Sequence, residues 1–175
     1  MLIWVLGQSR SAISSIISQY VGANKLNEVK ALPSQAIAII LIIATIICFI
    51  TYPLSKSIFS LYNASDLLLD YCVSYYKIRV IGLPLTLYVF AVFGVFRGLQ
   101  NTYYPMKIAI SGATINILLD FVLVYGIKDW FLPLNLQGAA IASVLSQFLM
   151  AILATHYLLK KTEIPLRFSN TLNKE

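Results

Sequence analysis

One acidic side chain of this sequence, Asp120, lies deep inside an apolar stretch. The chain has seven acidic residues, and the other six fall in predicted loops, helix ends or tails. If that stretch crosses a membrane, an ionised carboxylate near its middle costs about 2.5–3.5 kcal/mol even on the lenient insertion scale. Such a group is usually protonated, paired or bound to a cation, and each of these states can act as a switch.

Asn116 precedes Asp120 by four residues, so both side chains fall on the same face of a helix. The amide can donate a hydrogen bond to the carboxylate, or the two can ligate a small cation such as Na⁺ together. The alternative is an Asp–Asn pair that only ties two helices to each other. We favour the functional interpretation, because ionisable residues inside membrane spans commonly mark ion and proton pathways.

The composition supports a membrane-embedded chain. Hydrophobic residues make up 59% and charged residues 11%, and the mean hydropathy is +0.79. A soluble domain carries about a quarter charged residues, so this chain has too little polar surface for a water-exposed globule. The net charge of +6 does not indicate a nucleic-acid partner, because the Lys and Arg residues lie between apolar stretches instead of clustering on one arm.

The pattern predicts an all-α polytopic membrane protein with about five helices. Pro53 should bend the second helix, and Gly82 with Pro84 should kink the third. Gly94 and Gly98 form a small-xxx-small pair that permits close helix packing. The expected helices cover about residues 2–22, 35–61, 67–100, 106–127 and 137–159.

Two helices carry unusual faces. The first has a polar stripe that either lines a watery cavity or packs against a helix outside this chain; it comprises Gln8, Ser11, Ser15, Ser18 and Gln19. On the last helix, small residues at Gly138, Ala142 and Ser146 predict a close-packing surface, with Ser143 beside them.

The basic residues set the expected topology. The loops on one side hold seven basic residues against at most four on the other, so the richer side should be cytoplasmic. The seven are Lys25, Lys30, Arg97, Lys107, Lys160, Lys161 and Arg167. Lys77 and Arg79 are expected to snorkel or to pair with Asp70. We expect a multi-pass protein of the cell (inner) membrane.

No feature of the sequence indicates an enzyme. It contains no phosphate-binding G-x-x-x-x-G-K-[ST] loop, no nucleophile–base pairing and no metal-ligand cluster. Cys48 and Cys72 lack metal-binding spacing, and His156 is expected to be an interfacial residue. We therefore expect no cofactor, and an ion gradient as the energy source for any pumping.

Three segments together resemble one transporter family. The segment from Gly94 to Met106, GVFRGLQNTYYPM, looks like the fourth-to-fifth helix junction of the multidrug and toxic compound extrusion (MATE) family. Asn116 to Asp120 resembles the fifth-helix motif of its DNA-damage-inducible-type branch, and Gln137 to Ser143 resembles the start of its sixth helix. The resemblance covers nearly the whole chain.

The resemblance implies a cation-coupled antiporter that exports organic cations or drugs against H⁺ or Na⁺. It assigns Asp120, Asn116 and Ser143 to the cation-coupling site. Residues 1–161 would be part of the N-terminal six-helix lobe, from its second to its sixth helix, and 162–175 a polar cytoplasmic tail or a truncated inter-lobe linker. The partners would be the first helix, with its second key Asp, the second lobe, the lipid bilayer and the substrate. Phe90 stands where some members have an Asn.

Two other functions remain open at this stage. A lipid-linked oligosaccharide flippase of the wider superfamily would need many basic residues facing its cavity, and this chain offers few. A structural membrane subunit without transport activity would tolerate the loss of the Asp120 carboxylate.

Overall fold

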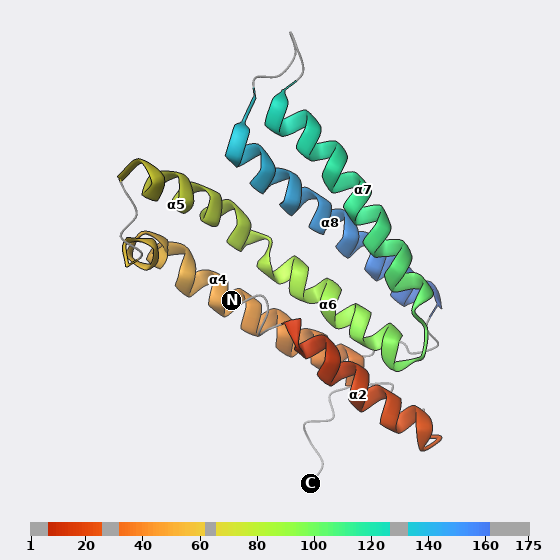
Figure 1. Ribbon diagram of the computed structural model, residues 1–175. Coiled ribbons are helices and arrows are strands. Elements are labelled where there is room, and N and C mark those ends of the chain that lie inside the picture. Colours follow the sequence, from red (N-terminus) through yellow and green to blue (C-terminus); the bar gives the residue numbers. More distant parts are fainter. Residues whose placement is uncertain (1–6, 26–31, 62–65, 127–132, 162–175) are drawn as a thin grey trace.

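The computed structural model describes residues 7–25, 32–61, 66–126 and 133–161 (Figure 1). The expected tail, 162–175, lies outside these ranges, as do residues 2–6 of the first expected helix. The described residues form six helices and confirm the all-α fold. They are α2 (Ser9–Gly22), α4 (Leu32–Ser60), α5 (Asp66–Ile81), α6 (Leu83–Gly98), α7 (Tyr103–Tyr125) and α8 (Asn135–Lys161).

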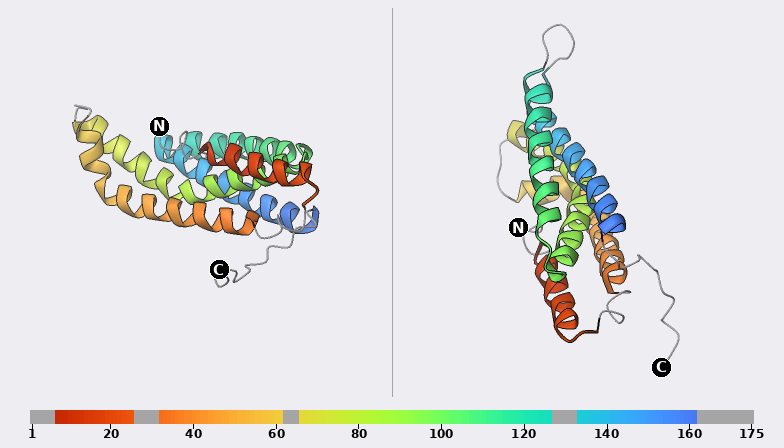
Figure 2. Two further views of the ribbon diagram at one scale, coloured as in Figure 1. Left: turned by 90° about the horizontal axis from the view of Figure 1, so that it is seen from below. Right: turned by 90° about the vertical axis from the view of Figure 1, so that its right-hand side faces the viewer.

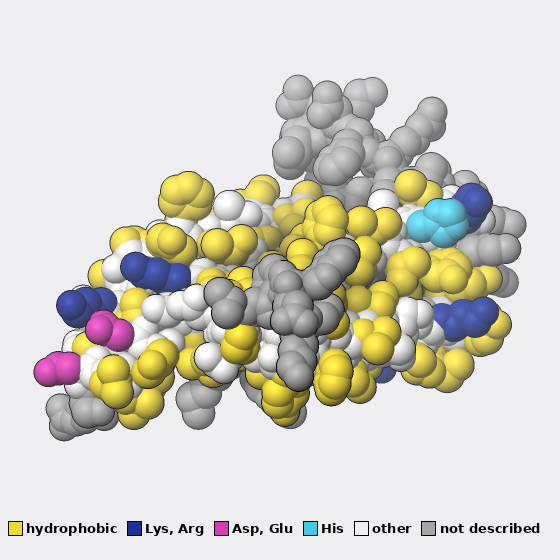
Figure 3. Space-filling view, turned by 90° about the horizontal axis from the view of Figure 1, so that it is seen from above, with side chains coloured by type: hydrophobic (Ala, Val, Ile, Leu, Met, Phe, Trp, Pro, Cys, Tyr) yellow, Lys and Arg dark blue, Asp and Glu magenta, His cyan; other side chains and the backbone are white. Residues whose placement is uncertain are grey.

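Three of the described helices, α4, α7 and α8, are long and apolar enough to cross a membrane. The pair α5 and α6 adds a fourth candidate as one broken span, bent by 45°. Many large apolar side chains are exposed, including Ile39, Phe49 and Phe121. On the face drawn in Figure 3, the charged side chains lie mostly towards the two ends, with apolar side chains between them. Lipid contact explains such a surface.

The helix α6 forms the centre of the bundle. It packs against α2, α4 and α8, while α7 packs chiefly on α8 at one edge (Figure 1). Ten of its sixteen residues are buried, because α6 is apolar on most of its faces and helices pack on several of them. The core therefore runs along α6, with Ile13 and Ile17 of α2 and Leu158 of α8 against it.

The expected close approach through Gly94 and Gly98 is confirmed between α6 and α2. A Cβ atom on Gly94 would lie 2.7 Å from the Arg10 carbonyl oxygen, and one on Gly98 would lie 2.6 Å from Ile17 Cβ. The absence of side chains thus lets the two backbones touch. The polar stripe of α2 is exposed on the side away from α6, so its partner stays a prediction.

Both expected breaks are present. α4 continues through Pro53 and changes direction towards its C-terminal end (Figure 2). The third expected helix divides at Gly82 into α5 and α6. Pro84 stands in the first turn of α6, where its missing N–H leaves no helical partner unsatisfied.

We predict that Gly98→Ala destabilises the bundle, because Ile17 and the α2 backbone must move to admit a methyl group. The expected loss is about 1–3 kcal/mol, typical of overpacking. Titration of the purified protein with sodium dodecyl sulfate, following its unfolding midpoint, measures it. Gly22→Ala is the matched control, since a Cβ there meets nothing within 4 Å; equal midpoints for both variants would contradict the prediction.

Candidate functional site

Asp120 and Asn116 are half-buried on one face of α7, as their spacing predicts. The Oδ1 atom of Asp120 and the Nδ2 atom of Asn116 are buried and have no hydrogen-bond partner among the described residues. A buried polar atom without a partner costs about 1–3 kcal/mol, and more if it is charged. The carboxylate oxygen is therefore suited to hold a proton or a cation, or to meet a group from outside the described residues.

The depth of Asp120 differs from the expectation. The helix α7 begins and ends earlier than the predicted range, so Asp120 lies five residues before its last residue, Tyr125. This separation is about 7.5 Å along the helix axis. The carboxylate is thus nearer to the expected outer end of the span than to its middle.

A cavity of about 390 Å³ lies beside Asn116, between α6, α7 and α8 and the end of α5. Most of its lining surface is apolar, and we call it the polar cavity for the polar side chains that it contains. Ser143 of α8 lines it together with Asn116, so the structure brings two of the three expected site residues to one space. Asp120, one turn further along α7, is not among the lining residues. The Ser146 hydroxyl, also at this cavity, donates to the Ser143 carbonyl oxygen at 2.9 Å.

The cavity also contains a polar cluster that sequence reasoning missed: Arg79, Thr86 and Gln147. In the amide orientation that satisfies both of its polar atoms, Gln147 accepts from Arg79 Nη1 at 3.0 Å and donates to the Gly82 carbonyl oxygen at 3.3 Å. Thr86 Oγ1 donates to the same carbonyl at 3.1 Å. Gln147 of α8 thereby reaches the backbone at the break between α5 and α6.

Of the two expectations for Arg79, snorkelling or pairing with Asp70, the pairing is wrong. The two residues are nine positions apart in α5, about 13.5 Å along the axis, which is beyond direct contact. Lys77 also has a different neighbour, since its Nζ lies 5.6 Å from the centroid of the Tyr52 ring. The sequence did contain a signal for the contact between Arg79 and Gln147 at the helix break. Arg79 is a charged residue three positions before the Gly-Leu-Pro segment at which the helix breaks.

The aromatic residues of the span 66–98 divide between three environments. Phe90 and Phe93 line the polar cavity, whereas Phe96 is buried in the core. The guanidinium carbon of Arg10 lies 5.6 Å from the centroid of Phe90, a cation–π contact. Tyr76 packs edge-on against Phe59, with 5.4 Å between the ring centroids.

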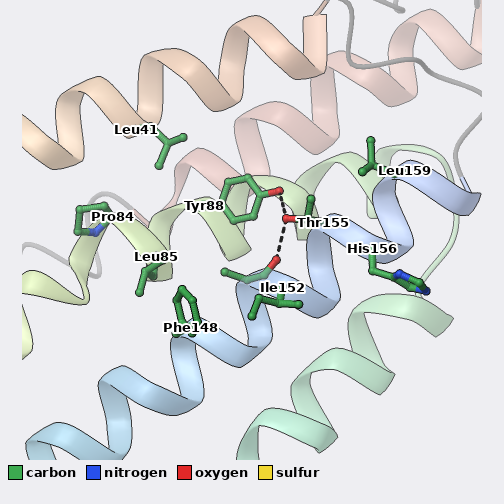
Figure 4. A pocket seen from close by; sticks show the side chains of 10 residues that line it. Leu41, Pro84, Leu85, Tyr88, Phe148, Ile152, Thr155, His156 and Leu159 are labelled. Carbon is green, nitrogen blue, oxygen red and sulfur yellow. Dashed lines mark hydrogen bonds between the residues drawn. The ribbon is translucent and has the colours of Figure 1, made fainter.

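A second pocket, of about 530 Å³, lies between α4, α6 and α8 and is almost entirely apolar (Figure 4). Its one buried polar contact joins Tyr88 Oη and Thr155 Oγ1 at 2.6 Å. Thr155 also donates to the Ala151 carbonyl at 2.8 Å, so Tyr88 is the donor to Thr155 and neither hydroxyl has a proton left for a ligand. His156 is exposed at its edge, as an interfacial residue would be.

Fold and site define a multi-pass helical membrane protein with a polar cavity between its spans. The family model MatE matches residues 1–122, well over half of the sequence. The chain therefore belongs to the MatE family of membrane transporters and is not an enzyme.

Curated relatives agree with this family. Protein DETOXIFICATION 43 of Arabidopsis thaliana is 34% identical over 90 residues, which cover 51% of this chain and 16% of that protein. The multidrug export protein MepA of Staphylococcus haemolyticus is 29% identical over 147 residues, covering 84% of this chain and 31% of that protein. Because these relatives carry the names of other groups, the DNA-damage-inducible-type branch is not favoured over them.

A solved structure shows the same fold. An inward-facing multidrug resistance MATE family transporter of the MOP superfamily matches with a TM-score of 0.84 at 20% identity, over 93% of this chain and 36% of that one. The described helices thus correspond to part of a MATE lobe. The chain spans about a third or less of the length of the relatives that it matches.

We predict that Gln147→Leu weakens the junction of α5, α6 and α8, because it removes the acceptor for Arg79 and the donor to the Gly82 carbonyl. Arg79 keeps contact with the cavity, so the expected loss is at the low end for a hydrogen bond to a charged group, about 1 kcal/mol. The unfolding midpoint in detergent measures it. Gln19→Leu, at an exposed position of α2, should cost less; the opposite order would refute the role of Gln147.

Proposed function

We propose that this chain forms part of a cation-coupled antiporter that exports organic molecules, with Asp120, Asn116 and Ser143 as its coupling site. The observation that carries the proposal is the buried Oδ1 atom of Asp120, which has no hydrogen-bond partner among the described residues. A carboxylate oxygen of this kind gains stability from H⁺ or Na⁺. Its occupancy can therefore follow a gradient of either ion.

The three residues would act at two neighbouring points. Asp120 takes up the coupling ion, and Asn116 connects it to the cavity, since its side chain lies on the same helix face and also lines that space. Ser143 supplies a hydroxyl from the facing helix α8. Loading of Asp120 would thereby alter the polar groups that a substrate meets in the cavity.

Organic cations and drugs are the substrate class that the resemblance implies. The described cavity, about 390 Å³, is of a size that suits a drug-like molecule. Its rings, Phe90 and Phe93, suit the apolar part of such a molecule, whatever the sign of its charge.

The proposed partners follow from the coverage of the relatives. A first helix and a second lobe would complete the transporter, and the exposed polar stripe of α2 would face one of them. We place the complete protein in the cell (inner) membrane, with the basic ends of α6 and α8 in the cytoplasm.

We predict that Asp120→Asn abolishes coupled export while leaving the protein folded. The amide keeps the shape of the carboxylate but cannot bind a proton or neutralise a cation. The measurement uses the product of the complete gene, reconstituted in liposomes. Two substrates are tried: ethidium, a flat organic cation, and 2-naphthoate, an organic anion. For whichever of them the protein carries, the rate of gradient-driven export should fall at least about tenfold.

Asp70→Asn provides the matched control, since Asp70 is an exposed acid on α5. Its export rate should stay close to that of the unaltered protein. Coupled export that survives in Asp120→Asn would assign Asp120 a structural role instead.

A further inference from the structure

We infer that the cavity between α6, α7 and α8 binds the negatively charged group of a soluble organic anion, and that Arg79 is the residue that binds it. The inference that this anion is a substrate rests on the proposed export function. The inference that it binds does not depend on that function. The inference departs from the organic-cation class that the resemblance implies.

The position of Arg79 is the first argument. It lies near the middle of the bent span 66–98, half-buried, and lines the cavity. An arginine at such depth costs about 2.5–3.5 kcal/mol and almost always faces a bundle interior or a watery space. The guanidinium has five N–H donors, and its one hydrogen bond within the described residues uses Nη1. Donors thus remain for a ligand.

The charge of the described lining is the second argument. Arg79 is its one ionisable residue, and no acid lines the cavity within the part of the chain that the structure describes. Arg10, stacked on the cavity-lining ring of Phe90, adds a second positive charge nearby. An organic cation entering this space would meet Arg79 and be repelled by the charge of Arg10 beyond the lining, whereas an anion would be attracted by both.

The hydrogen-bonding groups are the third argument. Asn116 presents a buried Nδ2 donor that has no acceptor among the described residues. The Ser146 hydroxyl and the Gln147 amide are already bonded within the protein. The lining therefore has donors to spare at Arg79 and Asn116, which a carboxylate satisfies because it only accepts.

The side chains that line the cavity restrict the class of ligand that it can bind. Phe90 and Phe93 offer apolar ring surfaces on α6 within the same lining as Arg79 and Asn116. A carboxylate matches the planar guanidinium in a paired geometry. An aromatic or otherwise flat apolar body carrying one carboxylate therefore fits both parts.

A purely structural role for Arg79 is the competing explanation. Its bond to Gln147 links α8 to the helix break, and this alone would justify the side chain. Such a latch predicts an effect on stability without any selectivity for the charge of a ligand. Binding of matched ligands of opposite charge separates the two explanations.

The test uses the purified product of the complete gene in nanodiscs of phosphatidylcholine. Isothermal titration calorimetry measures the affinities for 2-naphthoate and for 2-naphthylmethylammonium, which share a ring system and differ in charge. We expect naphthoate to bind at least about tenfold more tightly. Arg79→Gln should weaken naphthoate binding by about tenfold without weakening the ammonium, and Arg79→Lys should keep the preference for the anion.

Arg97→Gln is the matched control, because it removes the same charge from an exposed position at the end of α6 and should leave both affinities unchanged. If the Arg79 variants do not fold, Gln147→Glu neutralises Arg79 in place and should weaken naphthoate binding equally. Tighter binding of the ammonium, no binding of naphthoate, or a preference that stays unchanged in Arg79→Gln or Gln147→Glu would overturn the inference.

A lipid headgroup is another source of the same anionic chemistry. Nanodiscs that contain phosphatidylglycerol should not compete with naphthoate for the site; competition that disappears in Arg79→Gln would assign the site to a lipid and overturn the soluble ligand. Binding requires no ion gradient. Loss of the charge preference therefore refutes the anion site alone, whereas unchanged coupled export in Asp120→Asn refutes the coupling role alone.

Discussion

Backbone polar groups inside a bilayer must find partners within the protein, and the break between α5 and α6 is where this constraint shapes the molecule. Gly82 interrupts the span with a bend of 45°, and its carbonyl accepts the backbone N–H of Thr86 at 3.0 Å. Gln147 and Thr86 bond to that carbonyl, and Gln147 also holds Arg79. These side-chain contacts at the helix break thus place polar groups beside the cavity between α6, α7 and α8.

The rest of the bundle supports this arrangement through close packing of small residues. Gly94 and Gly98 bring α2 onto one side of α6, while Gly138 brings α8 against the backbone of α7 at Leu123. Both contacts depend on an absent Cβ atom, because lipid supplies no hydrophobic force between helices and dispersion contact must do so. The rigid pairs that result hold Asn116 of α7 opposite Ser143 of α8.

The site combines an acidic residue, Asp120, with a basic one, Arg79, and Asp120 does not line the cavity that Arg79 lines. Asp120 has a buried oxygen in need of a proton or cation, and Arg79 carries donors for an anion. In the proposed coupled antiporter, two ligands would have to influence each other without occupying one point. The face of α7 that carries Asn116 and Asp120 offers a connection between them, since one residue lines the cavity and the other lies a turn beyond it.

The sequence by itself determined the class of the chain, its helices, the kink at Gly82 and the close packing at Gly94 and Gly98, because apolar run length, Pro and Gly act locally. It also placed Asn116 and Asp120 on one face, since helical spacing requires it. The tertiary structure alone decided that Asn116 and Ser143 share a cavity, that Asp120 lies outside its lining, and that Arg79 meets Gln147. These depend on how α5, α7 and α8 cross, and no local pattern encodes contacts between residues separated by 68 positions, as Arg79 and Gln147 are.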